Sequence, residues 1–512
     1  MKFKINILIA VLACAAVSCL KNEIVYDSGK VDYRLVKIAA PIAKVHVPLY
    51  KHLEKELDGL FVDGEVICIK YTHSERIDWN DEIGLSGSVK NWTIPFGGSV
   101  IGKTEFKIHL TSSEEEDSYV SVANLTTGEI IFTLPETGSP SGNIQITIPE
   151  LTKGGIAFTQ TIPLPSSGIP YIYPLEGYII ETDVNHDIRV HFLVDASGSG
   201  DLNVEFELTK MEVSYMSGYF GQLKYNDNEG KMDFDFFDKL NLVGSFGFKG
   251  IQMDAVVTNR TGIPMNIKAD FFFTNENGLN KPLDMEKPFD ITVLAATESG
   301  SNHIVEPSVT TPPFSTSLSQ IEFNDGQYPS QLKFNVNGIS NPDIEIDKEN
   351  FVVKNNDDPL AEIDFTLTMP MYIKIEGYSR KDTIDFDYNH IVGNDEDHIN
   401  NVEYLNINLM VDNNLPFDVT MKEAIVINEQ ETYRERIMSE NKISSGEKGK
   451  YIEIQLNKEK LEGFRKNDVK KIILSTSGKT SNGVDNYVQV KESASLDIAV
   501  SVNAKLNIPS NF

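Results

Sequence analysis

The chain has 512 residues, more than one hydrophobic core usually serves, and this length predicts about three domains. Apolar residues make up 40% of it and charged residues 24%, a composition that is typical of globular proteins and excludes general disorder. The formal net charge of −29 repels nucleic-acid phosphates and excludes nucleic acid as a partner. Three cysteines are too few for a disulfide scaffold or a cysteine-rich zinc site.

The first twenty residues carry an export signal. Two lysines precede an apolar run at residues 5–17, which is too short for a transmembrane helix and fits a secretory signal peptide. The run ends in Ala16-Val17-Ser18-Cys19, which resembles a bacterial lipobox. The resemblance implies cleavage after residue 18 and a fatty-acid anchor, such as palmitate, on Cys19. An ordinary signal peptide with an incidental cysteine is the alternative.

The residues after the cysteine indicate the destination. Leu20 stands where an aspartate would retain a lipoprotein in the inner membrane, so the outer membrane is favoured. Lys21-Asn22-Glu23 resembles the surface-export tag of Bacteroidota lipoproteins but has a single acidic residue, which leaves the surface and periplasmic faces both open. No other segment reaches about 18 apolar residues, so the lipid is expected to be the sole contact with the membrane.

Helical periodicity is scarce in the mature chain and β periodicity is common. Residues 48–60 predict one helix that begins near Pro48, and residues 457–464 predict a second, shorter helix. Alternating apolar and polar residues predict strands with one buried face. The clearest runs lie at 105–110, 143–148, 188–194, 202–208, 251–257, 265–273, 405–411 and 451–456. The sequence therefore predicts an all-β protein of antiparallel, β-sandwich-like modules with minor helix.

An internal repeat divides the β-rich chain into modules. Residues 251–259, followed by Ile263-Pro264-Met265, match residues 405–413, followed by Leu415-Pro416-Phe417. Each copy has an alternating strand, an asparagine that suits a turn, and a proline at the start of the next strand. The order of elements predicts related modules.

The far ends of the copies also agree. Val353-Lys354 before the strand at 363–368 resembles Val490-Lys491 before the strand at 496–501. Residues 204–209 repeat that closing strand a third time, so three modules are expected to end near residues 215, 376 and 508. The predicted division is a signal peptide at 1–18, modules at 19–217, 218–376 and 402–512, and an acidic linker at 377–401.

The last strand leads to two further expectations. Residues 496–508 alternate throughout and are expected to close the third module by pairing inside its sheet. Residues 402–512 are then expected to fold alone, because the repeat indicates a complete module.

Motifs for catalysis and metal binding are missing from the sequence. There is no G-x-S-x-G, H-E-x-x-H, Walker or dinucleotide motif, and no catalytic residue or cofactor is predicted. The closest histidines, His186 and His191, would point to opposite faces of one strand. The pairs Asp233/Asp235 and Asp385/Asp387 each face one way, but two carboxylates fall far short of a calcium site. Solvated strand faces are favoured, and calcium binding is left open.

Aromatic residues give the remaining hint of a ligand. Trp79 and Trp92, both in the first predicted module, are candidates for stacking on a sugar ring, as are Tyr171, Tyr173 and the Gly-Tyr-Phe-Gly run at 218–221. Packing in a core or turn is the alternative, and it is also expected for Cys68 on its alternating strand.

These patterns resemble those of the multidomain β-rich lipoproteins of the Bacteroidota, on the strength of the signal and the architecture. The resemblance implies no activity. The sequence predicts a non-enzymatic cell-envelope lipoprotein whose repeated modules mediate binding or assembly at the outer membrane, with a protein or glycan partner. A glycan-binding lipoprotein of a nutrient-uptake system is the alternative. An enzyme would need carboxylates or histidines that converge in one cleft.

Overall fold

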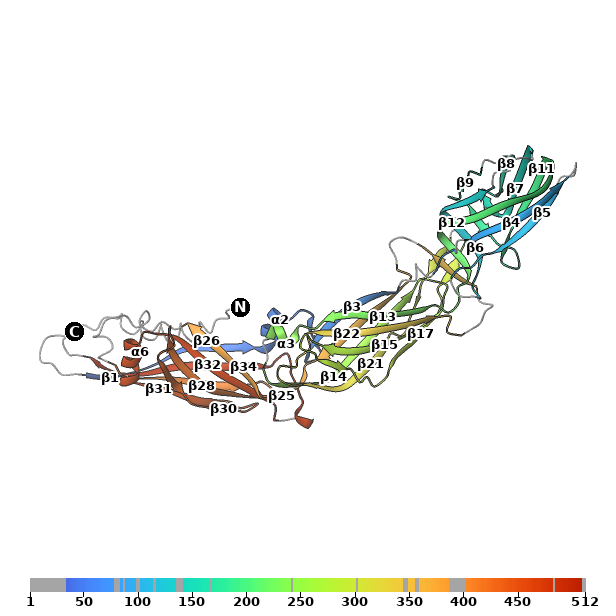
Figure 1. Cartoon of the computed structure of the whole chain (residues 1–512). Coiled ribbons are helices and arrows are strands. Elements are labelled where there is room, and N and C mark those ends of the chain that lie inside the picture. Colours follow the sequence, from blue (N-terminus) through green and yellow to red (C-terminus); the bar gives the residue numbers. More distant parts are fainter. Residues whose placement is uncertain are drawn as a thin grey trace.

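Three β-sandwich modules follow one another along an elongated molecule (Figure 1). The computed structural model describes residues 34–77, 83–85, 88–97, 102–113, 117–134, 141–164, 168–240, 243–300, 303–343, 349–354, 359–385, 402–481 and 484–508. Within these residues all strand pairs are antiparallel, and the all-β class is confirmed.

Module I occupies one end of the molecule and comes from one stretch of chain, apart from a short strand, β23. Its strands are β4 (Ser88–Gly97), β5 (Gly102–His109), β6 (Tyr119–Thr133), β7 (Ser141–Lys153), β8 (Ile156–Leu164), β9 (Tyr171–Pro174), β10 (Ile179–Glu181), β11 (Asp187–Ser197), β12 (Ser199–Tyr219) and β23 (Asn350–Val353).

Module II lies in the middle and contains two short helices. Its elements are α2 (Leu49–Glu56), β2 (Leu60–Asp63), β3 (Val66–Ile77), β13 (Lys224–Asp233), α3 (Phe236–Leu240), β14 (Ser245–Asn259), β15 (Met265–Thr274), β16 (Asn280–Pro282), β17 (Phe289–Val293), β18 (Thr297–Ser299), β19 (Ile304–Glu306), β20 (Ser308–Val309), β21 (Phe314–Phe323), β22 (Gln331–Ser340), β24 (Ala361–Pro370) and β25 (Tyr372–Glu376).

Module III forms the other end. Its elements are β1 (Arg34–Pro48), β26 (Tyr378–Asp385), β27 (Val402–Asn413), β28 (Asp418–Asn428), β29 (Arg434–Met438), β30 (Asn441–Ile443), β31 (Lys450–Asn457), α6 (Lys458–Lys466), β32 (Val469–Lys479), η1 (Val484–Asn486), β33 (Val488–Gln489) and β34 (Ser495–Ile508). Both predicted helices are present: α2 starts after Pro48, and the Asn457 side chain caps α6 by accepting a hydrogen bond from the Lys460 N–H.

Eight strand positions recur in all three modules. The first sheet has the order β4-β12-β6-β9 in module I, β3-β24-β14-β21 in module II and β1-β34-β27-β31 in module III. The second sheet has the order β5-β11-β7-β8, β13-β22-β15-β17 and β26-β32-β28-β29, respectively. In module I the short strand β10 pairs with both β6 and β7 and so connects the two sheets. If the positions are lettered A to H along the chain, every module has the sheets A-H-C-F and B-G-D-E. This is the order of a jelly roll.

The modules are nested in the chain rather than consecutive. Module I lies between strands A and B of module II, which are β3 and β13. Modules I and II together lie between strands A and B of module III, which are β1 and β26. Strand β1 consequently pairs with β34, with Arg34 opposite Ile508 and Pro48 opposite Ser495.

This nesting corrects the predicted boundaries. The first predicted module, 19–217, includes strands that belong to modules II and III. The predicted linker at 377–401 begins with β26, which pairs with β32 inside module III, and residues 386–401 lie outside the described residues. The third predicted module, 402–512, lacks two strands of its own sandwich, because strands that pair across hundreds of residues leave no local mark in the sequence.

The repeated asparagine has the same role in both copies. The Asn259 side chain accepts a hydrogen bond from the Thr261 N–H at 2.9 Å and donates one to the Ile263 carbonyl at 2.8 Å. Asn413 does the same with the Leu415 N–H at 3.0 Å and the Phe417 carbonyl at 3.0 Å. Both side chains are fully buried, so each amide fixes the turn from strand C to strand D.

The predicted closing strand is confirmed. Strand β34 runs between β1 and β27 in the first sheet of module III. Val500 and Val502 are buried in the core of this module, and Leu496 and Ile498 pack against it. The core of module III is separate from the larger cluster that modules I and II share.

A short strand joins each pair of neighbouring modules. In each pair it comes from the module whose strands enclose the other module in the sequence. Strand β23, from the G-to-H connection of module II, pairs with β12 of module I. Strand β33, from the same connection of module III, pairs with β25 of module II. The two sequence pairs Val353-Lys354 and Val490-Lys491 therefore mark the joints between modules.

The two joints differ in their side chains. At the joint between modules I and II, the buried amides of Asn341 and Asn350 bond each other at 2.9 and 3.1 Å and also bond the Gly221 and Gly262 carbonyls. At the other joint the buried ring of Tyr487 donates its hydroxyl to Glu322 at 3.1 Å. Burial raises the pKa of this tyrosine far above its ordinary value, so it remains a donor.

Candidate functional site

Several residues singled out from the sequence lie outside the described residues. These are Cys19, Trp79 and Asp387. Cys68 is buried on β3 with its thiol directed at the Val66 carbonyl, and burial raises its pKa, which fits the expected packing role.

Trp92 lies in an aromatic cluster inside module I. Its ring stacks on Phe106 with centroids 4.8 Å apart, and it contacts Phe206 at 5.2 Å and Phe192 at 5.6 Å. This is packing against a core, the alternative to sugar stacking. Tyr219 and Phe220 are buried as well.

The acidic and histidine pairs do not converge on one point. Asp235 forms an ion pair with Lys239 at 2.7 Å, while Asp233 and Asp385 are exposed on their strands. His186 precedes β11 and stacks on Tyr119, whereas His191 faces Glu105 from the strand. Among the described residues, no three His, Cys, Asp or Glu side chains are close enough to hold a metal ion.

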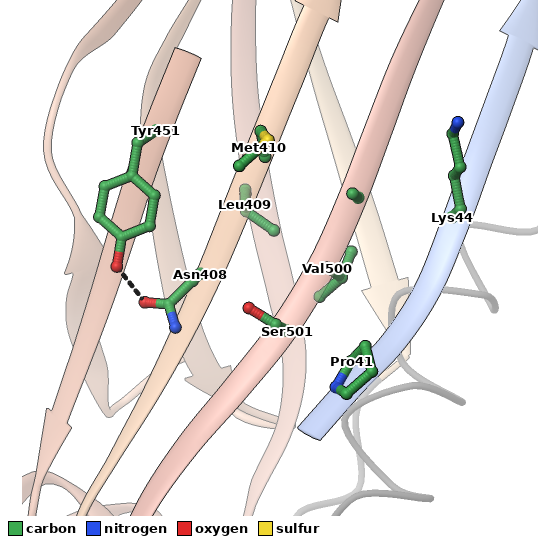
Figure 2. A pocket seen from close by; sticks show the side chains of 9 residues that line it. Pro41, Lys44, Asn408, Leu409, Met410, Tyr451, Val500 and Ser501 are labelled. Atoms are coloured by element: carbon green, nitrogen blue, oxygen red, sulfur yellow. Dashed lines mark hydrogen bonds between the residues drawn. The ribbon is translucent and has the colours of Figure 1, made fainter. Parts of the chain in front are cut away.

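A shallow groove crosses the outer face of the first sheet of module III (Figure 2). Its floor is the pair of small residues Ala499 and Ser501 on the central strand β34. One wall consists of Met410 and Tyr451, which are 53% and 55% exposed, and the other wall carries Lys44 and Pro41 of β1. The groove has a volume of about 440 Å³.

The pairing register produces this shape. Ala499 lies opposite Lys44 on one side and Met410 on the other, and Met410 lies opposite Tyr451. The small side chain of Ala499 thus lies between the long side chains of Lys44 and Met410 on neighbouring strands. The Tyr451 hydroxyl donates a hydrogen bond to Asn408 at 2.7 Å, which holds the ring over the groove.

Polar pairs lie beyond both ends of the floor on β34. At one end His46 and Asp497 are 2.6 Å apart, and this histidine, more than any other group, lowers the pKa of the aspartate. At the other end Lys505 forms an ion pair with Glu403. The groove between these pairs is lined mainly by apolar atoms, and its open shape suits an extended or flat ligand.

Sequence reasoning missed the groove residues. Tyr451 could have been recognised from its position in the alternating pattern of its strand. It lies on the outward face with Glu453 and Gln455, where an aromatic residue is unusual. Met410 breaks the polar face of β27 in the same way. Neither residue could be placed opposite β1 without the long-range pairing.

Comparisons with known proteins give no functional relative. No family model matches the chain, and no curated protein matches it. A solved structure from Parabacteroides distasonis, described as a "putative secreted protein", has 7% identity and a TM-score of 0.29, with 91% of this chain and 99% of that chain covered. A structure of infectious bursal disease virus, Gx strain, has 8% identity and a TM-score of 0.12, with 85% and 82% covered. Likenesses this distant carry no argument about activity.

Proposed function

We propose that this protein is an exported cell-envelope lipoprotein, anchored to the outer membrane through Cys19, that binds a partner without catalysis. The lipobox-like Ala16-Val17-Ser18-Cys19 supports the anchor. No helix among the described residues has both the length and the apolar character needed to cross a membrane.

The nested topology is the observation that carries this proposal. Strand β1 begins at Arg34, at the end of module III that faces away from module II, because Pro48 is the end that meets module II. Cys19 precedes Arg34 by 15 residues, which reach at most about 50 Å. Module I stands at the opposite end of the molecule (Figure 1). A lipid on Cys19 would therefore keep module III beside the membrane and hold module I away from it.

The groove on module III supports binding near the anchor. One of its walls, with Pro41 and Lys44, belongs to the same strand that follows the proposed tether. Its exposed Tyr451 and Met410 lie opposite each other on neighbouring strands and offer apolar contact area to a partner. A component of the envelope is the partner that this position favours.

The anchor is tested by labelling cells with radioactive palmitate. Cys19→Ser should abolish labelling and move the protein from the membrane fraction to the soluble fraction. Cys14→Ser, in the segment removed with the signal, is the matched control and should label like the wild type. Equal labelling of wild type and Cys19→Ser would refute the lipoprotein proposal.

Binding through the groove is tested with a photo-reactive benzoylphenylalanine in living cells. Placed at Met410, it should form one defined adduct with an envelope component, and this adduct should disappear when Cys19→Ser releases the anchor. Val309 is an exposed control position on module II and should give no such adduct. No adduct from position 410, or the same adduct from both positions, would contradict a role for the groove.

A further inference from the structure

A second pocket lies on the outer face of the second sheet of module II, away from the groove on module III. It has a volume of about 570 Å³, within the usual range for small-ligand sites of roughly 300–1,000 Å³. Strands β15 and β22 and the turn between β15 and β16 line it.

Strand alternation brings polar side chains to this face. On β22 the outward residues Gln331, Lys333 and Asn335 alternate with buried Leu332 and Phe334. On β15 Phe272 points outward between the buried rings of its two neighbours. Register places Phe272 directly opposite Lys333. A partly exposed phenylalanine ring therefore lies on the pocket surface among amide side chains.

The wall of the pocket is held in place by its own turn. The Asn275 side chain accepts hydrogen bonds from the Asn277 and Leu279 N–H groups, both at 2.9 Å, and donates one to the Tyr328 carbonyl at 2.8 Å. This asparagine is fully used in fixing the turn. The wall is thus preformed before any ligand arrives.

The remaining amides are free for a ligand. Within the described part of the chain, the side chains of Asn280, Gln331 and Asn335 make no hydrogen bond to the protein. Each amide offers both donors and an acceptor, which matches a hydroxyl group that donates and accepts at once. Thr274 also lines the pocket, and its buried hydroxyl has no partner among the described residues.

The charges on the pocket cancel. Lys333 and Glu276 are the charged residues that line it, one of each sign. On the neighbouring β13, Lys231 lies opposite Lys333 and Asp233 lies opposite Gln331, so the next strand adds no net charge. The whole chain, at −29, repels acidic polymers. The pocket therefore fits an uncharged ligand that carries many hydroxyls and one apolar ring face.

We propose that this pocket of module II binds a neutral oligosaccharide, with Phe272 under one sugar ring and with Asn280, Gln331 and Asn335 bonded to its hydroxyls. The site is independent of the anchor and of the groove on module III. It gives the molecule a ligand surface on the module between the proposed membrane end and module I.

The test is native electrophoresis of the mature chain carrying Cys19→Ser, in gels that contain one soluble polysaccharide each. The neutral panel is a xylan, a β-1,3-glucan, an α-mannan and a dextran, and polygalacturonate is the acidic comparison. At least one neutral polymer should retard the wild type. The double variant Gln331→Ala/Asn335→Ala should raise the apparent Kd at least tenfold, as should Phe272→Ala, while Phe272→Tyr restores binding.

Asn337→Ala is the matched control. Asn337 is exposed on the same face of the same strand, two residues beyond the pocket, and its removal should change the Kd less than twofold. Each variant should have the melting temperature of the wild type. This would show that binding is lost because contacts with the polysaccharide are removed, and not because the variant unfolds. The proposal is overturned if no neutral polymer retards the protein, if the double variant is retarded like the wild type, or if polygalacturonate binds more tightly than the neutral panel.

Discussion

Modules I and III have the same eight-strand order, but the chain builds them in different ways. Module I takes strands A to H from residues 88–219 in one stretch. Module III takes strand A from 34–48, strand B from 378–385 and the rest from 402–508. His46 and Asp497, which touch across its sheet, are 451 positions apart. Identical topology can thus be locally complete in one module and dependent on distant segments in another.

The largest effect is expected when the two modules are cut out along the sequence. Residues 83–223 should fold alone, because they contain all eight strands of module I. Residues 402–508 should not fold alone, because both sheets lose an edge strand and the core of module III is opened to water. The stabilisation lost in this way should exceed the net stability of a typical domain, about 5–15 kcal/mol. Circular dichroism with urea unfolding checks both. If 402–508 unfolds cooperatively, strands A and B are dispensable.

Reconnecting the missing strands should restore module III. A chain that joins 34–48 to 377–508 through a flexible linker of about ten residues should regain a cooperative transition, because β1 recovers its whole pairing with β34. A scrambled 34–48 sequence in the same chain is the control. Equal stability of the two chains would mean that β1 contributes no specific pairing.

The repeated asparagines should be equally important in modules II and III. Asn259→Ala and Asn413→Ala each remove at least three hydrogen bonds to backbone groups, and each should lower the free energy of unfolding by about 2–4 kcal/mol. Asn337→Ala, at an exposed position, should change it by less than about 0.5 kcal/mol. Because module III has a separate core, each loss should shift a different transition in guanidinium unfolding. A much smaller loss at one site would show that the two turns are not equivalent.

The smallest expected effect is the pH dependence that Asp418 contributes to the stability of module III. Burial alone would raise the pKa of Asp418, but hydrogen bonds from Lys442 at 2.9 Å, the Ser445 N–H at 2.8 Å and Ser481 at 2.9 Å outweigh it and lower the pKa. A lowered folded-state pKa stabilises the module above the unfolded-state pKa of about 3.9, and this contribution is lost as the pH falls.

Thermal unfolding between pH 7 and pH 2.5 checks this effect. The transition of module III should fall with acid. Asp418→Asn should lower the free energy of unfolding of module III by about 1–2 kcal/mol at pH 7 and make its decline with acid less steep. Asp233→Asn, at an exposed strand position, is the control and should leave the profile unchanged. An Asp418→Asn profile as steep as that of the wild type would rule out this carboxylate as the source.

The sequence predicted what depends on neighbours along the chain. The alternation of apolar and polar residues predicted the strands, and the repeated Asn259 and Asn413 predicted a shared turn. The closing strands near 215, 376 and 508 were placed correctly. The nesting was missed because β1 and β26 carry no mark of their distant partners. The groove was missed for the same reason: Pro41 and Tyr451 meet around it only through two strand pairings.

The pairing of β1 with β34 also sets an order of assembly in time. At roughly 5–20 residues per second, the 451 positions between His46 and Asp497 take about 20–90 s to synthesise. Module I has all its strands first, module II next, and module III waits for β34. If the chain is exported as proposed, it would leave the cytoplasm with module III still incomplete. Module III would then close around β1 in the compartment on the far side of the membrane.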